Sequence, residues 1–200
     1  AEKVTELGGL VVAMSDSTGF IHCEKGVDLK VIKEIKEVKR ECIDTYPEYD
    51  AKGKYHKDPK KMWEIKADIA MPCATQNELD EESVQHLIDH GGMMGAEGAN
   101  MPTTPKAIEL LRKHDILFAP GKAANAGGVL VSGLEISQNA SFNPWPFKKV
   151  DQKLKTTMKL ILNDIYEASK RYGKENDLLF GANVHSFKKI ARAMIQQGLI

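Results

Sequence analysis

Residues 93–119 read MMGAEGANMPTTPKAIELLRKHDILFA, and this stretch decides the fold. Its two apolar ends, 93–97 and 116–119, each predict a short buried strand. Between them, Thr104 can cap a helix that has Pro105 at its first position, which is the helical position that proline favours. A strand, a helix and another strand joined by short connections indicate neighbouring strands of a parallel sheet.

The same alternation continues toward the N-terminus. The apolar run at 10–14 is typical of a strand buried on both faces of a parallel sheet, and 68–72 is the next strand candidate. Helical spacing of apolar residues predicts a helix over 27–42, and Asp80 can cap a shorter one. The polar stretch 46–63 contains proline and glycine and is interpreted as a loop. We expect an α/β fold with a Rossmann-like, open, mostly parallel sheet, helices on both faces, and further helices at the C-terminus.

Composition and charge exclude several classes of protein. Of the 200 residues, 42% are hydrophobic and 28% are charged, which is typical of a globular chain. The formal net charge is zero, so no general attraction to nucleic acid or to an anionic membrane surface is expected. No apolar run approaches the ~20 residues of a membrane span, and the first residues do not resemble a signal peptide.

The cysteines and histidines give no metal or disulfide pattern. The three cysteines include no C-x-x-C pair, so neither a disulfide framework nor a cysteine-built zinc site is expected. The six histidines are scattered without the spacing of metal ligands. A reducing, cytoplasmic setting fits this usage best.

Four turns at the predicted strand ends are rich in small and amide residues. They are Ser15–Ser17, Cys73–Asn77, Gly98–Asn100 and Gly121–Gly128. In an open parallel sheet, ligands bind at the carboxyl ends of the strands. Small residues let an extended ligand approach the backbone, and amides bond carbonyl, hydroxyl and carboxamide groups. A dinucleotide carries all of these groups, so together the turns predict a ligand cleft.

The turn after the first predicted strand can contact the adenosine ribose. An acidic residue at this place usually bonds the ribose hydroxyls, whereas hydroxyl and basic residues accommodate a 2′-phosphate. Here Asp16 lies between Ser15 and Ser17, and Lys36 and Lys39 follow on the next helix. A solvated helix face explains the two lysines equally well, and composition does not choose between NAD and NADP.

No catalytic constellation is visible. Asp68, Glu97 and Glu135 are isolated carboxylates, and no spacing pairs a serine or a cysteine with a histidine. Lys122, beside the last turn, could touch a phosphate or carboxylate, although lysine is common on surface turns.

One expected element is missing. No G-x-G-x-x-G loop follows a first strand, and Gly8-Gly9 instead ends what looks like the tail of a helix. We expect the first strand and its glycine loop to lie upstream of Ala1. We therefore expect a dinucleotide-binding domain over 1–140 and a C-terminal helical segment over 141–200 that packs back on it.

At these same turns the sequence resembles the glutamate dehydrogenase family. The segments that carry the resemblance are DIAMPCATQNELD (68–80), AEGANMPTTPKA (96–107) and APGKAANAGGVLVSGLEISQNA (119–140). Supporting matches at 15–19, 150–158 and 181–198 extend it over essentially the whole chain. The segment SFNPWPFKK (141–149) departs from the usual family connector.

The resemblance implies roles for individual residues. Those expected to bind the cofactor are Ser15, Asp16, Ser17, Lys36, Lys39, Ala74, Thr75, Asn100 and Asn125. Those expected to face the substrate are Val129 and Ser132. The family's catalytic lysine and aspartate lie in another domain, so no catalytic residue and no metal ligand is expected in this chain.

The resemblance also implies an activity. The intact protein is expected to interconvert L-glutamate with 2-oxoglutarate and ammonia by hydride transfer, with NADP favoured and NAD as the alternative. It is expected to form a homo-oligomer, a hexamer, and to bind neither nucleic acid nor membrane. Two alternatives stay open: a non-catalytic dinucleotide-binding module, and a related amino-acid dehydrogenase with another substrate.

Overall fold

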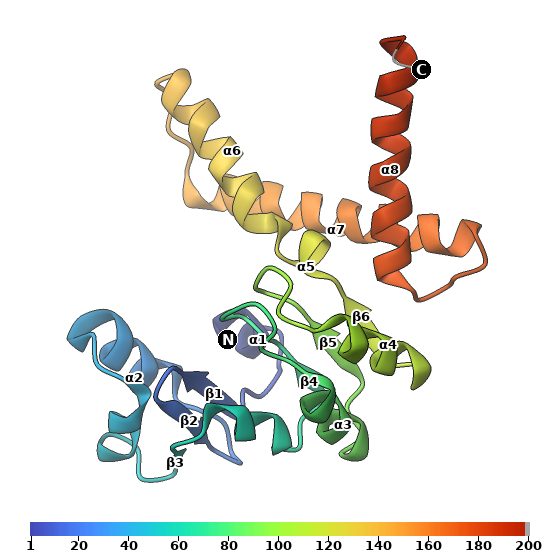
Figure 1. Ribbon diagram of the computed structural model, residues 1–200. Helices are drawn as coiled ribbons and strands as arrows, with labels where there is room; N and C mark the ends of the chain where they lie inside the picture. The colour runs from blue at the N-terminus through green and yellow to red at the C-terminus, as the bar shows by residue number, and fades with distance from the viewer. Residues whose placement is uncertain (199–200) are drawn as a thin grey trace. The chain divides into compact units, whose positions relative to one another are not determined.

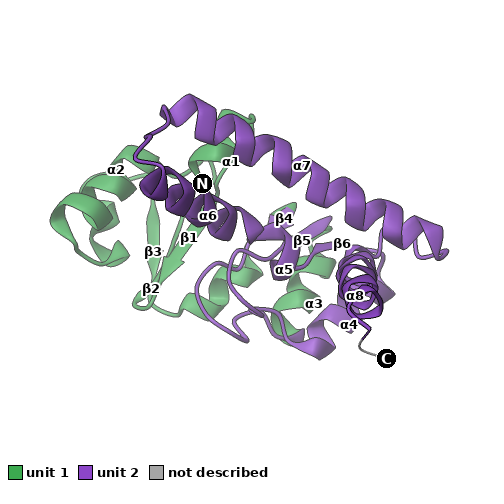
Figure 2. Cartoon of the chain, turned by 90° about the horizontal axis from the view of Figure 1, so that it is seen from above, with its two compact units in different colours: residues 1–68, 82–92 green, residues 69–81, 93–200 purple. Residues whose placement is uncertain are grey.

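Two three-stranded sheets organise the chain, one antiparallel and one parallel. The computed structural model describes residues 1–198, and each sheet lies in its own unit (Figure 2). Unit 1 comprises residues 1–68 and 82–92, and unit 2 comprises residues 69–81 and those from 93 onward. The predicted α/β class with a parallel sheet is confirmed.

Unit 1 is built on the antiparallel sheet, with the strand order β1-β2-β3 (Figure 1). Its strands are β1 (Ala13–Asp16), β2 (Gly19–His22) and β3 (Lys54–His56). A tight turn joins the first two, because Asp16 Oδ1 accepts hydrogen bonds from the backbone N–H and the hydroxyl of Thr18. The prediction of a parallel strand at 10–14 is therefore wrong: the strand begins later and pairs antiparallel with the strand that follows the turn.

The helices of unit 1 are short. They are α1 (Glu2–Glu6), α2 (Leu29–Lys33), the π-helical η1 (Glu34–Lys39), the 3₁₀ helices η2 (Ile43–Glu48) and η3 (Pro59–Glu64), and α3 (Glu81–Asp89), which begins in unit 2. The predicted helix over 27–42 is shorter at both ends: Asp28 caps it, and Arg40 ends it with a left-handed φ of 57°. The prediction of a loop over 46–63 is wrong in part, since β3 lies within this range and η3 overlaps its end.

Buried apolar side chains between the sheet and these helices form the core of unit 1. Its members are Ile21, Cys23, Val27, Ile32, Ile35, Ile43 and Tyr46. Tyr46 is fully buried, and its hydroxyl accepts a hydrogen bond from Asp28 N and donates one to Asp50 Oδ2. The core therefore holds the start of α2 through a polar contact as well as through packing.

Unit 2 is built on the parallel sheet, with the strand order β4-β5-β6. Its strands are β4 (Ile69–Ala70), β5 (Met94–Ala96) and β6 (Leu117–Ala119). Helix α4 (Pro105–Lys113) connects the last two, and Thr104 Oγ1 accepts a hydrogen bond from Ala107 N at 3.2 Å. The predicted cap, the proline at the first helical position and the parallel pairing are confirmed.

The remaining helices of unit 2 follow the parallel sheet. They are α5 (Gly121–Ala124), α6 (Ala126–Ala140), α7 (Phe147–Arg171) and α8 (Leu178–Gln196). Helix α8 crosses α7 toward the C-terminal end of α7 (Figure 1). Ala123, Ile165, Leu178 and Ala182 are buried together where α5, α7 and α8 meet. Among the helices of residues 1–198, none combines the length and apolar character of a membrane span.

Candidate functional site

Loops at the carboxyl ends of the three parallel strands surround an open hollow in unit 2. Its volume is about 410 Å³, which is within the range of small-molecule sites. The residues that line it are Cys73, Ala74, Thr75, Gln76, Gly98, Ala99, Asn100 and Asn125. The structure thus brings together Ala74, Thr75, Asn100 and Asn125, four of the residues that were predicted to contact a cofactor.

Backbone hydrogen bonds hold the walls of this hollow. The N–H groups of Gly98 and Ala99 both donate to the carbonyl of Pro72, at 3.0 and 3.2 Å. The N–H groups of Ala74 and Thr75 point to Glu78 Oε2, at 3.0 and 3.4 Å. The loop after β4 is therefore held both by the loop after β5 and by its own Glu78 side chain.

Asn100 and Asn125 form an oriented pair of amides. Asn125 Nδ2 donates to Asn100 Oδ1 at 2.8 Å and to the Ala99 carbonyl at 3.2 Å. These two bonds use both hydrogens of that amide. Asn100 Nδ2 and Asn125 Oδ1 have no hydrogen-bond partner within residues 1–198. The pair thus offers the hollow one free donor group beside one free acceptor.

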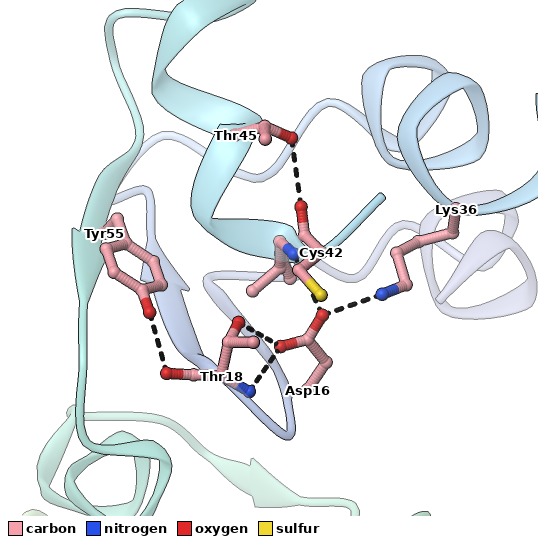
Figure 3. A network of polar contacts seen from close by, with 7 residues as sticks. Asp16, Thr18, Lys36, Cys42, Thr45 and Tyr55 are labelled. Atoms are coloured by element: carbon pink, nitrogen blue, oxygen red, sulfur yellow. Dashed lines mark hydrogen bonds and ion pairs between the residues drawn. The ribbon is translucent and has the colours of Figure 1, made fainter. Parts of the chain in front are cut away.

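A second polar cluster lies in unit 1, around Asp16 (Figure 3). Its Oδ1 accepts from Thr18 N at 2.9 Å and from Thr18 Oγ1 at 2.6 Å. Its Oδ2 accepts from Lys36 Nζ at 2.7 Å and from Ile43 N at 2.9 Å. Tyr55 supports the same turn by donating its hydroxyl to Thr18 O. Since a carboxylate has about four acceptor positions, Asp16 is fully engaged within the chain.

The other predicted residues of unit 1 differ in exposure and contacts. Ser17 is exposed, and Ser15 is half-buried on β1. Lys39 donates to the hydroxyl of Tyr49, and its ammonium nitrogen lies 4.2 Å from the centroid of that ring. The structure therefore places Lys36 against the turn, whereas Lys39 is held by an aromatic residue instead.

The pKa of Asp16 reflects these contacts. Burial raises the pKa of this carboxyl, but the Lys36 ammonium group and the hydrogen bonds from Thr18 and Ile43 outweigh burial and lower the pKa to about 2 from 3.8. A carboxyl with a depressed pKa stabilises the fold at pH values above its unfolded pKa. That stabilisation is lost as the pH falls through the folded value.

Replacing Asp16 with asparagine is expected to lower the free energy of unfolding by about 1–2 kcal/mol at neutral pH, allowing for partial solvent screening. The difference from the wild type should shrink as the pH falls from about 4 toward about 2, where the wild-type carboxyl is itself protonated. Urea unfolding at several pH values measures this. The exposed Asp44→Asn is the matched control, and a difference that is independent of pH would contradict the prediction.

The two predicted substrate residues lie on α6, outside the lining of the hollow. Val129 is 79% exposed, and Ser132 Oγ donates to the Gly128 carbonyl within the helix. Lys122 donates to Asn183 Oδ1 of α8 at 2.7 Å, so the structure gives it an internal partner. Within the described part of the chain, no group of three or more His, Cys, Asp or Glu side chains could hold a metal ion.

Relatives of known name match the whole chain. The glutamate dehydrogenase of Bacteroides thetaiotaomicron is 46% identical over 100% of this chain and 45% of its own length. The NADP-specific glutamate dehydrogenase of Helicobacter pylori is 42% identical over 99% of this chain and 46% of its own length. Other relatives are named NAD-specific or NAD(P)-specific.

Solved structures of glutamate dehydrogenases are also similar to this chain. Glutamate dehydrogenase 2 of Plasmodium falciparum superposes with a TM-score of 0.92 at 42% identity, covering 100% of this chain and 44% of that one. The chain therefore spans a little under half the length of the relatives it matches. The family model described as Glutamate/Leucine/Phenylalanine/Valine dehydrogenase matches residues 1–198, and the chain belongs to this family.

Proposed function

We propose that this chain is the cofactor-binding part of a glutamate dehydrogenase. The intact protein would interconvert L-glutamate with 2-oxoglutarate and ammonia, with NADP favoured over NAD. The observation that carries the proposal is the oriented pair Asn100 and Asn125, in a hollow at the carboxyl ends of three parallel strands. The names of the relatives support the substrate.

The free groups of the asparagine pair fit a nicotinamide. A primary carboxamide has one carbonyl acceptor and one amide donor side by side. Asn100 Nδ2 would donate to that carbonyl, and Asn125 Oδ1 would accept from that amide. Ala74, Thr75 and Ala99 are small enough to let a flat ring approach the backbone. When bound, the nicotinamide supplies hydride transfer, and these residues bind and orient it.

Residues of unit 1 would bind the adenosine end. Ser15 and Ser17 offer hydroxyl groups, and Lys36 offers a positive charge beside them. The acceptor positions of Asp16 are occupied by Thr18, Lys36 and Ile43. The donors that remain for the ligand are the serine hydroxyls and the N–H groups of Lys36 that do not bond Asp16. Such donors suit a 2′-phosphate, which supports NADP as the favoured cofactor.

Replacing Asn100 with alanine is expected to weaken binding of NADP or NAD by about three- to tenfold. One neutral hydrogen bond contributes about 1 kcal/mol, and 1.4 kcal/mol corresponds to a factor of ten. Isothermal titration calorimetry of the purified protein measures the change in affinity. Asn163→Ala, at an exposed position of α7, is the matched control, and equal affinities of the two variants would contradict the role of Asn100.

The activity itself is tested in the protein that carries these residues. Glutamate-dependent reduction of NADP, and more slowly of NAD, is expected. The 200 residues alone should bind cofactor without turnover, since the catalytic lysine and aspartate of the family have no counterpart here. Preference for leucine, phenylalanine or valine would favour the related dehydrogenase. Cofactor binding without turnover of any amino acid would favour the non-catalytic module.

Organisation and assembly complete the proposal. Residues 1–140 would bind the dinucleotide, with Val129 and Ser132 facing the substrate, and residues 141–200 would pack back on them. The bonds Lys122–Asn183 and Arg112–Asp177 support this packing within unit 2. The intact protein would be a homo-hexamer in the cytoplasm, where the three cysteines of this chain would stay reduced. Sedimentation of the intact protein tests the assembly.

A further inference from the structure

Glu97 is a buried carboxylate directly after β5, and it is not among the residues that line the hollow. It is 5% exposed, although ionisable side chains are almost never fully buried without partners. Its Oε2 accepts from the backbone N–H of Gly121 at 2.6 Å, and its Oε1 accepts from the backbone N–H of Thr103 at 3.2 Å. One side chain therefore ties the loop after β5 to the start of the helix that follows β6.

The two segments meet at close range. A Cβ atom at Gly121 would lie 2.8 Å from the Ala99 carbonyl oxygen and 3.2 Å from Glu97 Oε2, so this contact requires glycine. Gly121 O in turn accepts from Asn125 N at 2.9 Å, and Asn125 Nδ2 returns to the Ala99 carbonyl. The contacts of Glu97 with Gly121, of Gly121 with Asn125 and of Asn125 with Ala99, together with the chain from Ala99 back to Glu97, thus form a closed ring that includes one member of the asparagine pair.

The chemistry of the ring requires a carboxylate. Both partners of Glu97 are N–H donors, and an ionised carboxylate accepts at both oxygens. A glutamine of the same shape would turn its NH₂ group toward one of these donors. One backbone N–H at Gly121 or Thr103 would then lose its partner in a buried place, and the loops would separate to readmit water.

We propose that Glu97 is a positioning residue, which holds Asn100 and Asn125 in the register that lets their free donor and acceptor meet a carboxamide together. The inference rests on the proposed function, since the carboxamide is that of the nicotinamide. Glu97 itself touches no ligand. It acts on the two loops through Gly121 and Thr103, and its removal affects the nicotinamide end of the cofactor and not the adenosine end.

The test compares two ligands in the purified protein that carries this chain. NADP is titrated beside 2′-phospho-ADP-ribose, which lacks only the nicotinamide, and NAD is titrated beside ADP-ribose. In Glu97→Gln, affinity for the dinucleotides should fall by about tenfold, while affinity for the fragments should change by less than about twofold. Glu109→Gln, at an exposed position of α4, is the matched control and should change neither affinity.

A second variant keeps the negative charge of the carboxylate and shortens the side chain. Glu97→Asp is one methylene shorter, so its carboxylate can satisfy one N–H but not both. It should also lose dinucleotide affinity selectively, and it alone decides the question if Glu97→Gln does not fold. Circular dichroism of each variant reports whether the fold is retained.

Each outcome has a distinct meaning. A selective loss of dinucleotide affinity supports the inference. If the wild type binds the dinucleotide more tightly than its fragment and the Glu97 variants keep the same ratio, the inference is overturned and the proposed function stands. A parallel loss of both affinities makes Glu97 a general structural residue and also overturns the inference. If the wild type binds dinucleotide and fragment equally, the asparagine pair does not meet the carboxamide, and the proposed subsite fails as well.

Discussion

Replacing Gly181 with alanine is expected to destabilise unit 2 by about 3 kcal/mol, the upper part of the range for overpacking. An added Cβ would overlap the carbonyl oxygen of Ile165 and lie 2.9 Å from its carbonyl carbon. Both are backbone atoms of α7, so no side-chain rotation relieves the overlap. Helix α8 would have to move away from α7, which opens the buried contact of Leu178 and Ala182 with Ile165.

A second glycine provides a control, because its replacement with alanine should change the stability of unit 2 in the opposite direction. Gly133 lies inside α6, where an added Cβ meets no atom within 4 Å. Alanine there should stabilise the helix by about 0.5–1 kcal/mol, because glycine loses more backbone entropy on folding. Urea unfolding followed by tryptophan fluorescence measures both variants. Unit 2 contains Trp145 and unit 1 contains Trp63, so a Trp63→Phe background isolates the signal of unit 2.

The sign of the difference between the two glycine variants decides the prediction. Equal unfolding midpoints for Gly181→Ala and Gly133→Ala would show that α7 and α8 do not pack as closely in solution as in the structure. A loss confined to Gly181→Ala confirms the contact.

Replacing Tyr46 with alanine is expected to destabilise unit 1 by about 3–5 kcal/mol, as for other large buried aromatic residues. The ring is fully buried in the core with Ile21 and Ile35. Its hydroxyl also accepts from Asp28 N at 2.8 Å and donates to Asp50 Oδ2 at 3.0 Å. Burial raises the pKa of Tyr46, and the contact with Asp50 raises it further, which outweighs the lowering by the hydrogen bond from Asp28 N; the hydroxyl therefore stays protonated and keeps donating.

Tyr46→Phe separates packing from hydrogen bonding. It keeps the ring but leaves the N–H of Asp28 without its acceptor, which should cost about 1–3 kcal/mol. A Trp145→Phe background leaves Trp63 to report on unit 1. The expected order of midpoints is wild type, then Tyr46→Phe, then Tyr46→Ala. A phenylalanine variant as unstable as the alanine variant would contradict this prediction, because the cavity left by alanine would then cost no further stability.

Local sequence signals predicted unit 2 well. The cap at Thr104, the proline at 105 and the apolar runs on either side of α4 each depend on neighbours within a few residues. The small residues after each strand predicted a ligand hollow, and the structure gathers Ala74, Thr75, Asn100 and Asn125 around one. The parallel order of the strands makes this possible, because it brings their carboxyl ends to one edge.

Unit 1 was predicted less well, because its pairing depends on partners distant in the sequence. The apolar run at 10–14 reads as a parallel strand, but the turn at Asp16 sends the chain back to form a hairpin. Asp16 itself looked like a ribose ligand. Its contacts with Lys36 and Ile43, residues 20 and 27 positions away, could not be expected from the sequence. No spacing rule connects positions so far apart.

By itself, the sequence determined the family, the α/β class, the capped helix between two parallel strands and the amide-rich turns, since each depends on residue types at short range. Only the tertiary structure decided which amides pair and in which orientation, how Lys36 and Lys39 differ, and that Glu97 joins two loops. These features depend on distances between segments that folding brings together. The carboxylate of Glu97 meets the N–H of Gly121, 24 positions away, because the pairing of β5 with β6 brings the ends of these strands together.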